Sequence, residues 1–361
     1  MTSVDANKSR EFPFYRFEGT HREIGRQYGE SCKDLIMLHR DYALERLKKA
    51  IDISSNSEVE EAALEYRSYV MKYAPFFDEE IQGLAEGAGI SIGEAYFLQL
   101  RAEIYNYLDT TDECTTFAVS GNATSTGIPL IGQNADLPAF YKEVGVVIES
   151  VPDKNFATLM LTPAGQISYI GINDQGMGTF ANFLTCDGWR VGFPRYLLTR
   201  LALSKDNLTD AEEVIRNIYR ASSRNIIMMD KVGNSIDLET IPTEIARIES
   251  ENGLLAHSNH FVAASLLNEE RRSGEDLTNS QIRLQRMSEL LNENHGQINV
   301  EVMQKILRDR ANEPHTLCRK PGDYGTDSIT FASVIAEPSN KKIWVAVGPP
   351  HENEYKCYGF Q

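Results

Sequence analysis

The chain has 361 residues, of which 42% are hydrophobic and 24% charged, a composition typical of a soluble globular protein. Its formal net charge of -16 argues against nonspecific binding to nucleic acid or to an anionic membrane surface. The five cysteines are scattered, odd in number and without a CxxC pair, so neither a zinc knuckle nor a redox motif is supported.

The N-terminus, residues 1–14, is polar and lacks the apolar core of a signal peptide. No apolar run approaches the roughly 20 residues that a membrane helix needs. We therefore expect a cytoplasmic protein with reduced thiols and no membrane partner.

The first third of the sequence has mainly helical patterns. After a short alternating segment at 14–18, Thr20 and Glu23 form the capping-box pattern that begins a helix. Apolar residues at helical spacing extend this pattern to Leu47. Further helices are predicted around 58–73, at 77–86 and after Ser91. We expect this part to form a helical layer.

From Cys114 onward the hydrophobic period changes to two, which indicates strands. Two pairs of helical segments interrupt the strands. This order predicts two packed sheets covered by helices, an α+β layered fold without a linker between domains. The predicted strands are 128–134, 144–148, 157–161, 167–170, 177–181, 225–229, 235–239, 243–249, 254–256, 328–336, 342–347 and 355–360, and the helices are 194–204, 209–221, 278–293 and 299–309.

Several common catalytic motifs are missing from the sequence. The GxSxG match at 89–93 follows a helical segment rather than a strand, and there is no GxGxxG after a strand and no GxxxxGK[ST] loop, so serine-hydrolase and nucleotide-binding signatures are lacking. His257 and His260 have a spacing that could suit a metal. Without HExxH or a nearby carboxylate cluster, however, a metal is the weaker interpretation, and we expect no cofactor.

Cys114 lies where the helical pattern gives way to strands. A free cysteine is more often a small buried hydrophobe than a nucleophile, but the preceding residues 105–113 are polar and typical of a turn. A thiol here could attack the carbonyl of Glu113, and hydrolysis of the thioester would make Cys114 a new N-terminus. Its α-amine, with an unperturbed pKa of roughly 7.7–8.0, could then act as the general base.

Three segments in order carry a resemblance to a known family: Cys-Thr-Thr-Phe-Ala-Val at 114–119, Gly-Gln-Asn-Ala-Asp at 132–136 and His-Ser-Asn-His-Phe at 257–261. Together with the run at 19–30 and Glu-Gly-Ala-Gly at 86–89, they resemble the isopenicillin N acyltransferase family of autoproteolytic N-terminal-nucleophile hydrolases. The similarity extends over roughly residues 14–347.

The resemblance implies a four-layer αββα sandwich formed by two fragments of one precursor. Cleavage between Glu113 and Cys114 would give a helical chain, 1–113, and a catalytic chain, 114–361, within one domain. Cys114 would be the nucleophile, Asp136 the acid that supports the new amine, and Asn259 a donor to the oxyanion. Outside the family context, Asp136 could be a turn residue and Asn259 could simply bond to backbone.

Two positions depart from the family pattern. Several relatives have glycine where this chain has Glu113, and a bulkier charged residue at the scissile bond could slow cleavage. The fungal relative has an arginine near the position of Asp327, and an acid there would suit a cationic group on the substrate. Trp189 and Phe193 belong to an aromatic segment, 181–194, that is either a loop over the substrate pocket or an ordinary strand–helix connection.

The predicted function is hydrolysis of a small linear amide through an acyl-thioester on Cys114. The same intermediate also allows acyl transfer, with a coenzyme A thioester or an amide as donor and an amine as acceptor. A third alternative is an uncleaved, inactive relative that binds a small molecule. The unusual residue Glu113 before the cysteine keeps this alternative open.

Overall fold

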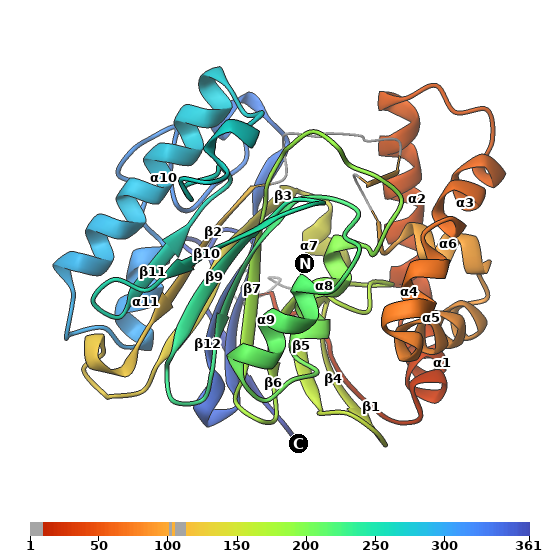
Figure 1. The fold of residues 1–361 in the computed structure, drawn as a ribbon, viewed down its shortest axis with the longest axis horizontal. Coiled ribbons are helices and arrows are strands. Elements are labelled where there is room, and N and C mark those ends of the chain that lie inside the picture. Colours follow the sequence, from red (N-terminus) through yellow and green to blue (C-terminus); the bar gives the residue numbers. More distant parts are fainter. Residues whose placement is uncertain (1–9, 101–102, 105–112) are drawn as a thin grey trace, which may run out of the picture.

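The computed structural model describes residues 10–100, 103–104 and 113–361. Of the turn predicted over 105–113, residues 105–112 lie outside the described residues, and Glu113 begins a strand instead. Two sheets form the centre of the molecule (Figure 1). The eight-stranded sheet runs in the order β1 (Phe14–Gly19), β4 (Gly145–Pro152), β5 (Thr158–Pro163), β6 (Ile170–Asn173), β7 (Gly178–Phe183), β8 (Arg224–Met229), β9 (Ser235–Thr240), β10 (Ile245–Glu249). The six-stranded sheet runs β11 (Leu254–His257), β2 (Glu113–Val119), β3 (Leu130–Pro138), β12 (Ser328–Glu337), β13 (Lys342–Val347), β14 (Lys356–Gly359).

Helices cover the outer face of each sheet. In Figure 1, α10 and α11 lie beside the six-stranded sheet, whereas α8, α9 and the N-terminal helices lie on the other side of the molecule. Three large hydrophobic clusters fill the spaces between these layers. The helices are α1 (His21–Ser31), α2 (Lys33–Ala50), α3 (Asn56–Leu64), α4 (Arg67–Tyr73), α5 (Pro75–Ala88), α6 (Ile92–Phe97), α7 (Tyr141–Val144), α8 (Arg195–Ala202), α9 (Leu208–Arg216), α10 (Gly274–Glu293) and α11 (Val300–Leu307).

The structure confirms the α+β fold with four αββα layers and adds detail at the N-terminal end. The capping box is present, with Glu23 N donating to Thr20 Oγ1 at 3.3 Å and Thr20 N donating to Glu23 Oε2 at 2.8 Å. The long helix predicted through Leu47 is divided at Cys32 into α1 and α2, and the helix predicted at 58–73 is divided into α3 and α4. Strand β1 also pairs in parallel with β4, so the N-terminal segment contributes to a sheet as well as to the helical layer.

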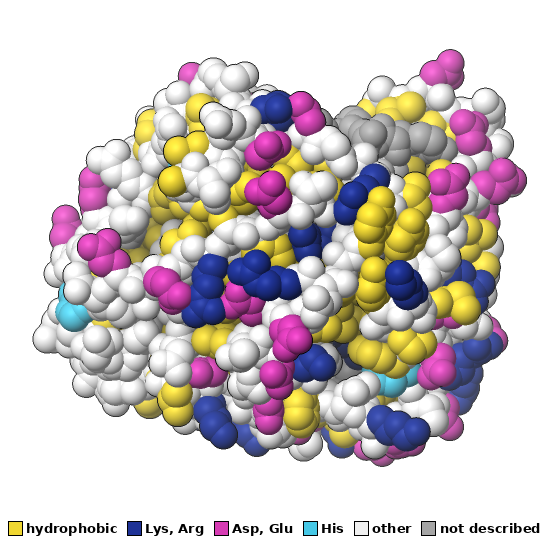
Figure 2. All heavy atoms as spheres, in the orientation of Figure 1, with side chains coloured by type: hydrophobic (Ala, Val, Ile, Leu, Met, Phe, Trp, Pro, Cys, Tyr) yellow, Lys and Arg dark blue, Asp and Glu magenta, His cyan; other side chains and the backbone are white. Residues whose placement is uncertain are grey.

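Charged groups are mixed over the surface. Figure 2 shows acidic and basic side chains interspersed on the face in view, although the chain as a whole is strongly acidic. Within the described residues, no helix has the length and apolar character needed to cross a bilayer.

Glycines allow α1 and α5 to pack at very short range. A Cβ added at Gly25 would lie 2.0 Å from the carbonyl oxygen of Glu80, and one at Gly87 would lie 2.2 Å from that of Arg26. Backbone therefore meets backbone along this helix pair, with no room for a methyl group. The spacing of Gly25 and Gly29 on α1, matched by Gly83 and Gly87 on α5, produces this contact.

We predict that Gly25→Ala lowers the free energy of unfolding by about 1–3 kcal/mol, because the added methyl group separates the two helices. Alanine is otherwise the better helix former, so a loss identifies packing as the cause. Denaturant unfolding measures the change. Glu30→Ala, at an exposed position of α1, is the control, and equal stability of Gly25→Ala and wild type would contradict this account.

Candidate active site

The first two sequence motifs lie on adjacent strands. In the antiparallel register of β2 and β3, Glu113 is opposite Asp136 and Cys114 is opposite Ala135. Cys114 is buried in the apolar cluster between the two sheets. Side chains alternate along a strand, so Glu113 points to the other face, toward α10. The bond between them therefore lies at the boundary of an apolar and an ionic environment.

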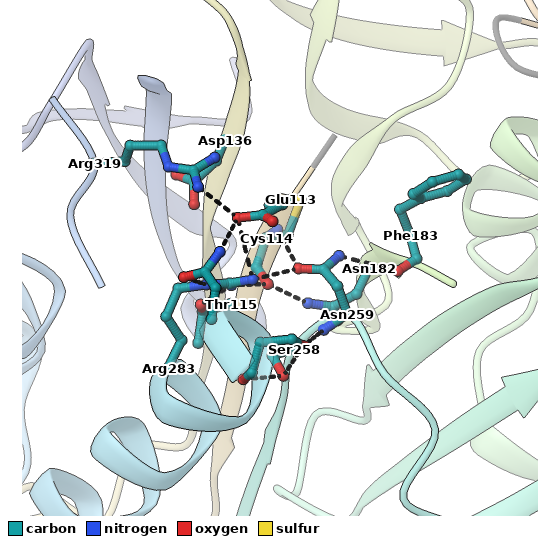
Figure 3. A network of polar contacts seen from close by, with 12 residues as sticks. Glu113, Cys114, Thr115, Asp136, Asn182, Phe183, Ser258, Asn259, Arg283 and Arg319 are labelled. Atoms are coloured by element: carbon teal, nitrogen blue, oxygen red, sulfur yellow. Dashed lines mark hydrogen bonds and ion pairs between the residues drawn. The ribbon is translucent and has the colours of Figure 1, made fainter. Parts of the chain in front are cut away.

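Asn259 holds the nitrogen of that bond. Its Oδ1 accepts from Cys114 N at 2.8 Å and from Arg283 Nη2 at 2.9 Å (Figure 3). Its Nδ2 donates to the carbonyl oxygen of Phe183 at 3.0 Å, and its own backbone N donates to Ser280 Oγ at 2.8 Å. The structure therefore brings Asn259 to Cys114 as predicted. Because its Nδ2 is already bonded here, donation to an oxyanion stays a prediction.

The side chains of Asn182, Arg283 and Gln133 also reach Cys114. Asn182 Nδ2 and Arg283 Nη1 donate to its carbonyl oxygen at 3.0 Å and 2.8 Å, and Arg283 also donates to Thr115 Oγ1 at 2.8 Å. Gln133 Nε2 lies 3.5 Å from the thiol sulfur, while Gln133 Oε1 accepts from Ala181 N at 3.0 Å. Both sheets therefore take part in fixing this one residue.

Asp136 is a buried acid with an unusual titration range. Thr330 Oγ1 donates to its Oδ1 at 2.6 Å, and Oδ2 has no hydrogen-bond partner among the described residues. Burial raises the pKa of Asp136 to about 6, against the opposing effects of Arg319 and Arg283. A carboxyl group with this pKa changes charge close to neutral pH, which suits a group that exchanges a proton or pairs with an amine.

The Glu113 carboxylate lies in a pocket of cationic and amide groups. Asn279 Nδ2 donates to it at 2.6 Å, Arg319 Nη2 lies 2.9 Å away, and Arg272 and Arg283 each approach to 3.4 Å. Burial alone would raise the pKa of Glu113, but the three arginines bring it below its ordinary value. Glu113 is therefore held as an anion beside Cys114.

The two histidines of the third motif are anchored within the protein. His257 Nε2 lies 2.8 Å from Glu239 Oε1 and its Nδ1 lies 2.9 Å from the carbonyl oxygen of Ser258. Burial would lower the pKa of His257, but Asp237 and Glu239 raise it to about 9. His260 Nδ1 lies 2.8 Å from Ser280 Oγ on α10. Among the described residues no group of three metal-ligating side chains occurs.

The three predicted substrate-binding residues have different surroundings. Asp327 is 60% exposed and pairs with Arg46 at 3.1 Å. Trp189 packs edge-on against Phe183, whose carbonyl oxygen accepts from Asn259, so Trp189 is linked to the Cys114 network. Phe193 is fully buried in the cluster beneath the helical layer. The binding roles of all three stay predictions.

Sequence reasoning missed several members of this network. Gln133 belongs to the motif at 132–136, and Asn182 belongs to the aromatic segment 181–194. Their closeness in sequence to the candidate residues could therefore have identified them. Asn279 and Arg283 are four residues apart on α10 and therefore share a face of that helix. No local pattern distinguishes them, or Arg272 and Arg319, from surface residues.

The four layers, with a buried cysteine near the start of the central strand β2, define an αββα sandwich. Residues 122–352 match the family described as acyl-coenzyme A:6-aminopenicillanic acid acyl-transferase. The chain belongs to this family, which confirms the resemblance seen in the sequence.

The chain is also similar to individual proteins. The chain is 28% identical over 340 residues to the 40 kDa form of acyl-coenzyme A:6-aminopenicillanic-acid-acyltransferase from Emericella nidulans, with 92% of each chain covered. Among solved structures, a conjugated bile acid hydrolase from Clostridium perfringens is 14% identical, with a TM-score of 0.45, covering 69% of this chain and 97% of that one. Penicillin V acylase from Agrobacterium tumefaciens is 12% identical, with a TM-score of 0.40, covering 64% and 82%.

We predict that Glu113→Ala lowers the free energy of unfolding by about 3–5 kcal/mol, because buried guanidinium groups lose their carboxylate partner. The comparison is made by denaturant unfolding in a Cys114→Ala background, so that both proteins keep the 113–114 bond. Glu45→Ala, which removes an exposed ion pair with Lys49, should change stability by about 0.5 kcal/mol or less. A similarly small effect of Glu113→Ala would contradict the assigned pairing.

Proposed function

We propose that this protein is a self-cleaving cysteine amidase whose nucleophile is Cys114. The observation that carries the proposal is the restraint on both sides of the 113–114 bond. Arginines and Asn279 hold the Glu113 side chain, Asn259 holds the Cys114 nitrogen, and Asn182 with Arg283 holds the Cys114 carbonyl. A bond fixed in this way beside a thiol is prepared for intramolecular attack.

Self-cleavage would proceed by transfer of an acyl group from nitrogen to sulfur. The Cys114 sulfur attacks the Glu113 carbonyl carbon, the C–N bond breaks, and the thiol proton passes to the nitrogen of Cys114. Water then hydrolyses the thioester. This step gives a new main-chain carboxylate on Glu113, a free thiol on Cys114 and a free α-amine on Cys114. In this proposal Asp136, opposite Glu113 in the ladder, stabilises that amine when it becomes protonated.

The mature site would act on an external amide by the same chemistry. The α-amine accepts the thiol proton, sulfur adds to the substrate carbonyl, and the proton passes to the leaving amine. The acyl-thioester that remains is then hydrolysed. Hydrolysis is the first choice because water is always present, whereas an acceptor needs its own binding site.

Acyl transfer is the second candidate, and the family supports it. The Emericella relative is named as an acyltransferase that uses acyl-coenzyme A. Both reactions share the acyl-thioester, so the residues around Cys114 do not separate them. The partition of an acyl group between water and an added amine or thiol, measured by product analysis, distinguishes hydrolase from transferase.

We predict that freshly purified protein contains two fragments that meet at Glu113 and Cys114. Intact-mass analysis measures both species, and Cys114→Ala is the control that should remain a single chain. A full-length wild-type chain with an unreactive Cys114 would contradict the proposal and would instead support the third alternative, a binding protein without catalysis.

We further predict that self-cleavage slows as the pH falls through about 6. The raised pKa of Asp136 means that its carboxylate form predominates only above that value, and the protonated form no longer stabilises a cationic amine. Cleavage of newly refolded precursor, followed by mass at a series of pH values, measures the rate. Asp136→Asn should be slow throughout, with no inflection near 6, and an unchanged pH profile in that variant would exclude this role.

A further inference from the structure

The groups around Glu113 form a complete carboxylate-binding site. Arg319 and Asn279 contact the carboxylate at 2.9 Å and 2.6 Å, and Arg272 and Arg283 lie at 3.4 Å. All four are buried, with exposed fractions of 5% or less. Guanidinium and amide donors arranged around a carboxylate are the usual means of anion recognition in proteins.

Self-cleavage would remove one negative charge from this site. In the uncleaved chain, the guanidinium groups of Arg272, Arg283 and Arg319 each approach the Glu113 carboxylate. Once Glu113 leaves with the released chain end, all three lose that contact, and protonation of the new α-amine would add positive charge nearby. Removing a carboxylate from a buried ionic contact is unfavourable, so the vacated site favours a new anion.

The site also borders the reacting bond. Arg283 lies within 3.4 Å of the Glu113 carboxylate and donates to the Cys114 carbonyl oxygen at 2.8 Å and to Asn259 Oδ1 at 2.9 Å. Figure 3 shows Arg283 between Glu113 and Asn259, next to Cys114. A carboxylate bound in this site is therefore close enough to the carbon that sulfur attacks for a short acyl chain to join them.

The intermediate of self-cleavage identifies the matching substrate. Its acyl group is glutamyl, joined to Cys114 sulfur through the main-chain carbonyl, with the side-chain carboxylate among the arginines. An external amide with the same acyl group would form the same kind of thioester. We infer that the mature protein acts on amides whose acyl part carries a second carboxylate. This carboxylate is separated from the acyl carbonyl carbon by as many bonds as the side-chain carboxylate of glutamate is from its main-chain carbonyl. Examples are N-acyl-α-glutamyl amides and monoamides of glutaric acid.

This inference rests on the proposed function and concerns only the acyl side of the substrate. In both reactions sulfur replaces nitrogen on the acyl carbon, and water then returns the thiol and releases the acid. Only the leaving amine differs, because it is the Cys114 nitrogen in self-cleavage and a separate molecule in turnover.

A matched pair of chromogenic substrates tests the inference. Glutaric acid mono-p-nitroanilide carries the carboxylate, and the corresponding terminal carboxamide is its uncharged counterpart. We expect kcat/KM for the acid to exceed that for the carboxamide by roughly tenfold or more, the effect typical of hydrogen bonds to a charged group. In Arg272→Gln the ratio should fall toward one, and Arg272→Lys, which keeps the charge, should retain part of it.

Arg271→Gln provides the matched control. This neighbouring arginine pairs with Asp187 on the surface and does not contact Glu113, so the ratio should stay at the wild-type value. Melting temperature and intact mass show whether each variant folds and matures. A wild-type ratio near one, or a wild-type ratio retained in Arg272→Gln, would overturn the inference.

The outcomes separate this inference from the proposed function. A chain that matures and cleaves both anilides equally retains the proposed function and rejects the acyl-carboxylate site. A chain that neither matures nor cleaves either anilide rejects both. For a chain that matures without turning over either anilide, protection of Cys114 from iodoacetamide by glutarate, but not by glutaramide, supports the site, and equal protection rejects it.

Discussion

The active site depends on one buried ionic contact, between the Glu113 carboxylate and three arginines. Buried ions are stable inside a protein only when they are paired and hydrogen-bonded with good geometry. This requirement restricts the positions of the surrounding chain segments. Because Glu113 precedes Cys114, the restriction extends to the cysteine. The contact thus links the placement of Cys114 to the stability of the fold.

Helix α10 provides most of this restriction from a single face. Asn279 bonds Glu113, Ser280 bonds the backbone of Asn259, and Arg283 bonds both Asn259 and the Cys114 carbonyl oxygen. These residues occupy one and a half turns of a helix that packs beside β2 and β11. The helix therefore fixes the relative position of Cys114, on β2, and Asn259, which follows the end of β11.

Local features of the sequence predicted the fold well. Contacts in the site between residues that are distant in the sequence could not be predicted from it. The Thr20 cap and the change of period at Cys114 are encoded within a few residues and were found where expected. Cys114, Asp136 and Asn259 were identified through their family motifs. Arg272 and Arg319 are far from Cys114 in sequence, and only the packing of α10 and β12 on β2 and β3 brings them to Glu113. A buried arginine of this kind has the same local sequence pattern as an exposed one.

Strand β1 has a consequence for the two-chain form of the protein. It pairs with β4 along its whole length, and the Tyr358 hydroxyl donates to the Phe12 carbonyl oxygen at 3.0 Å, so segments from both ends of the sequence are joined. A chain cut after Glu113 would keep these bonds and remain one folded body. Its unfolding, however, would also release two separate polypeptides. The equilibrium would then depend on protein concentration, as it does for an obligate heterodimer.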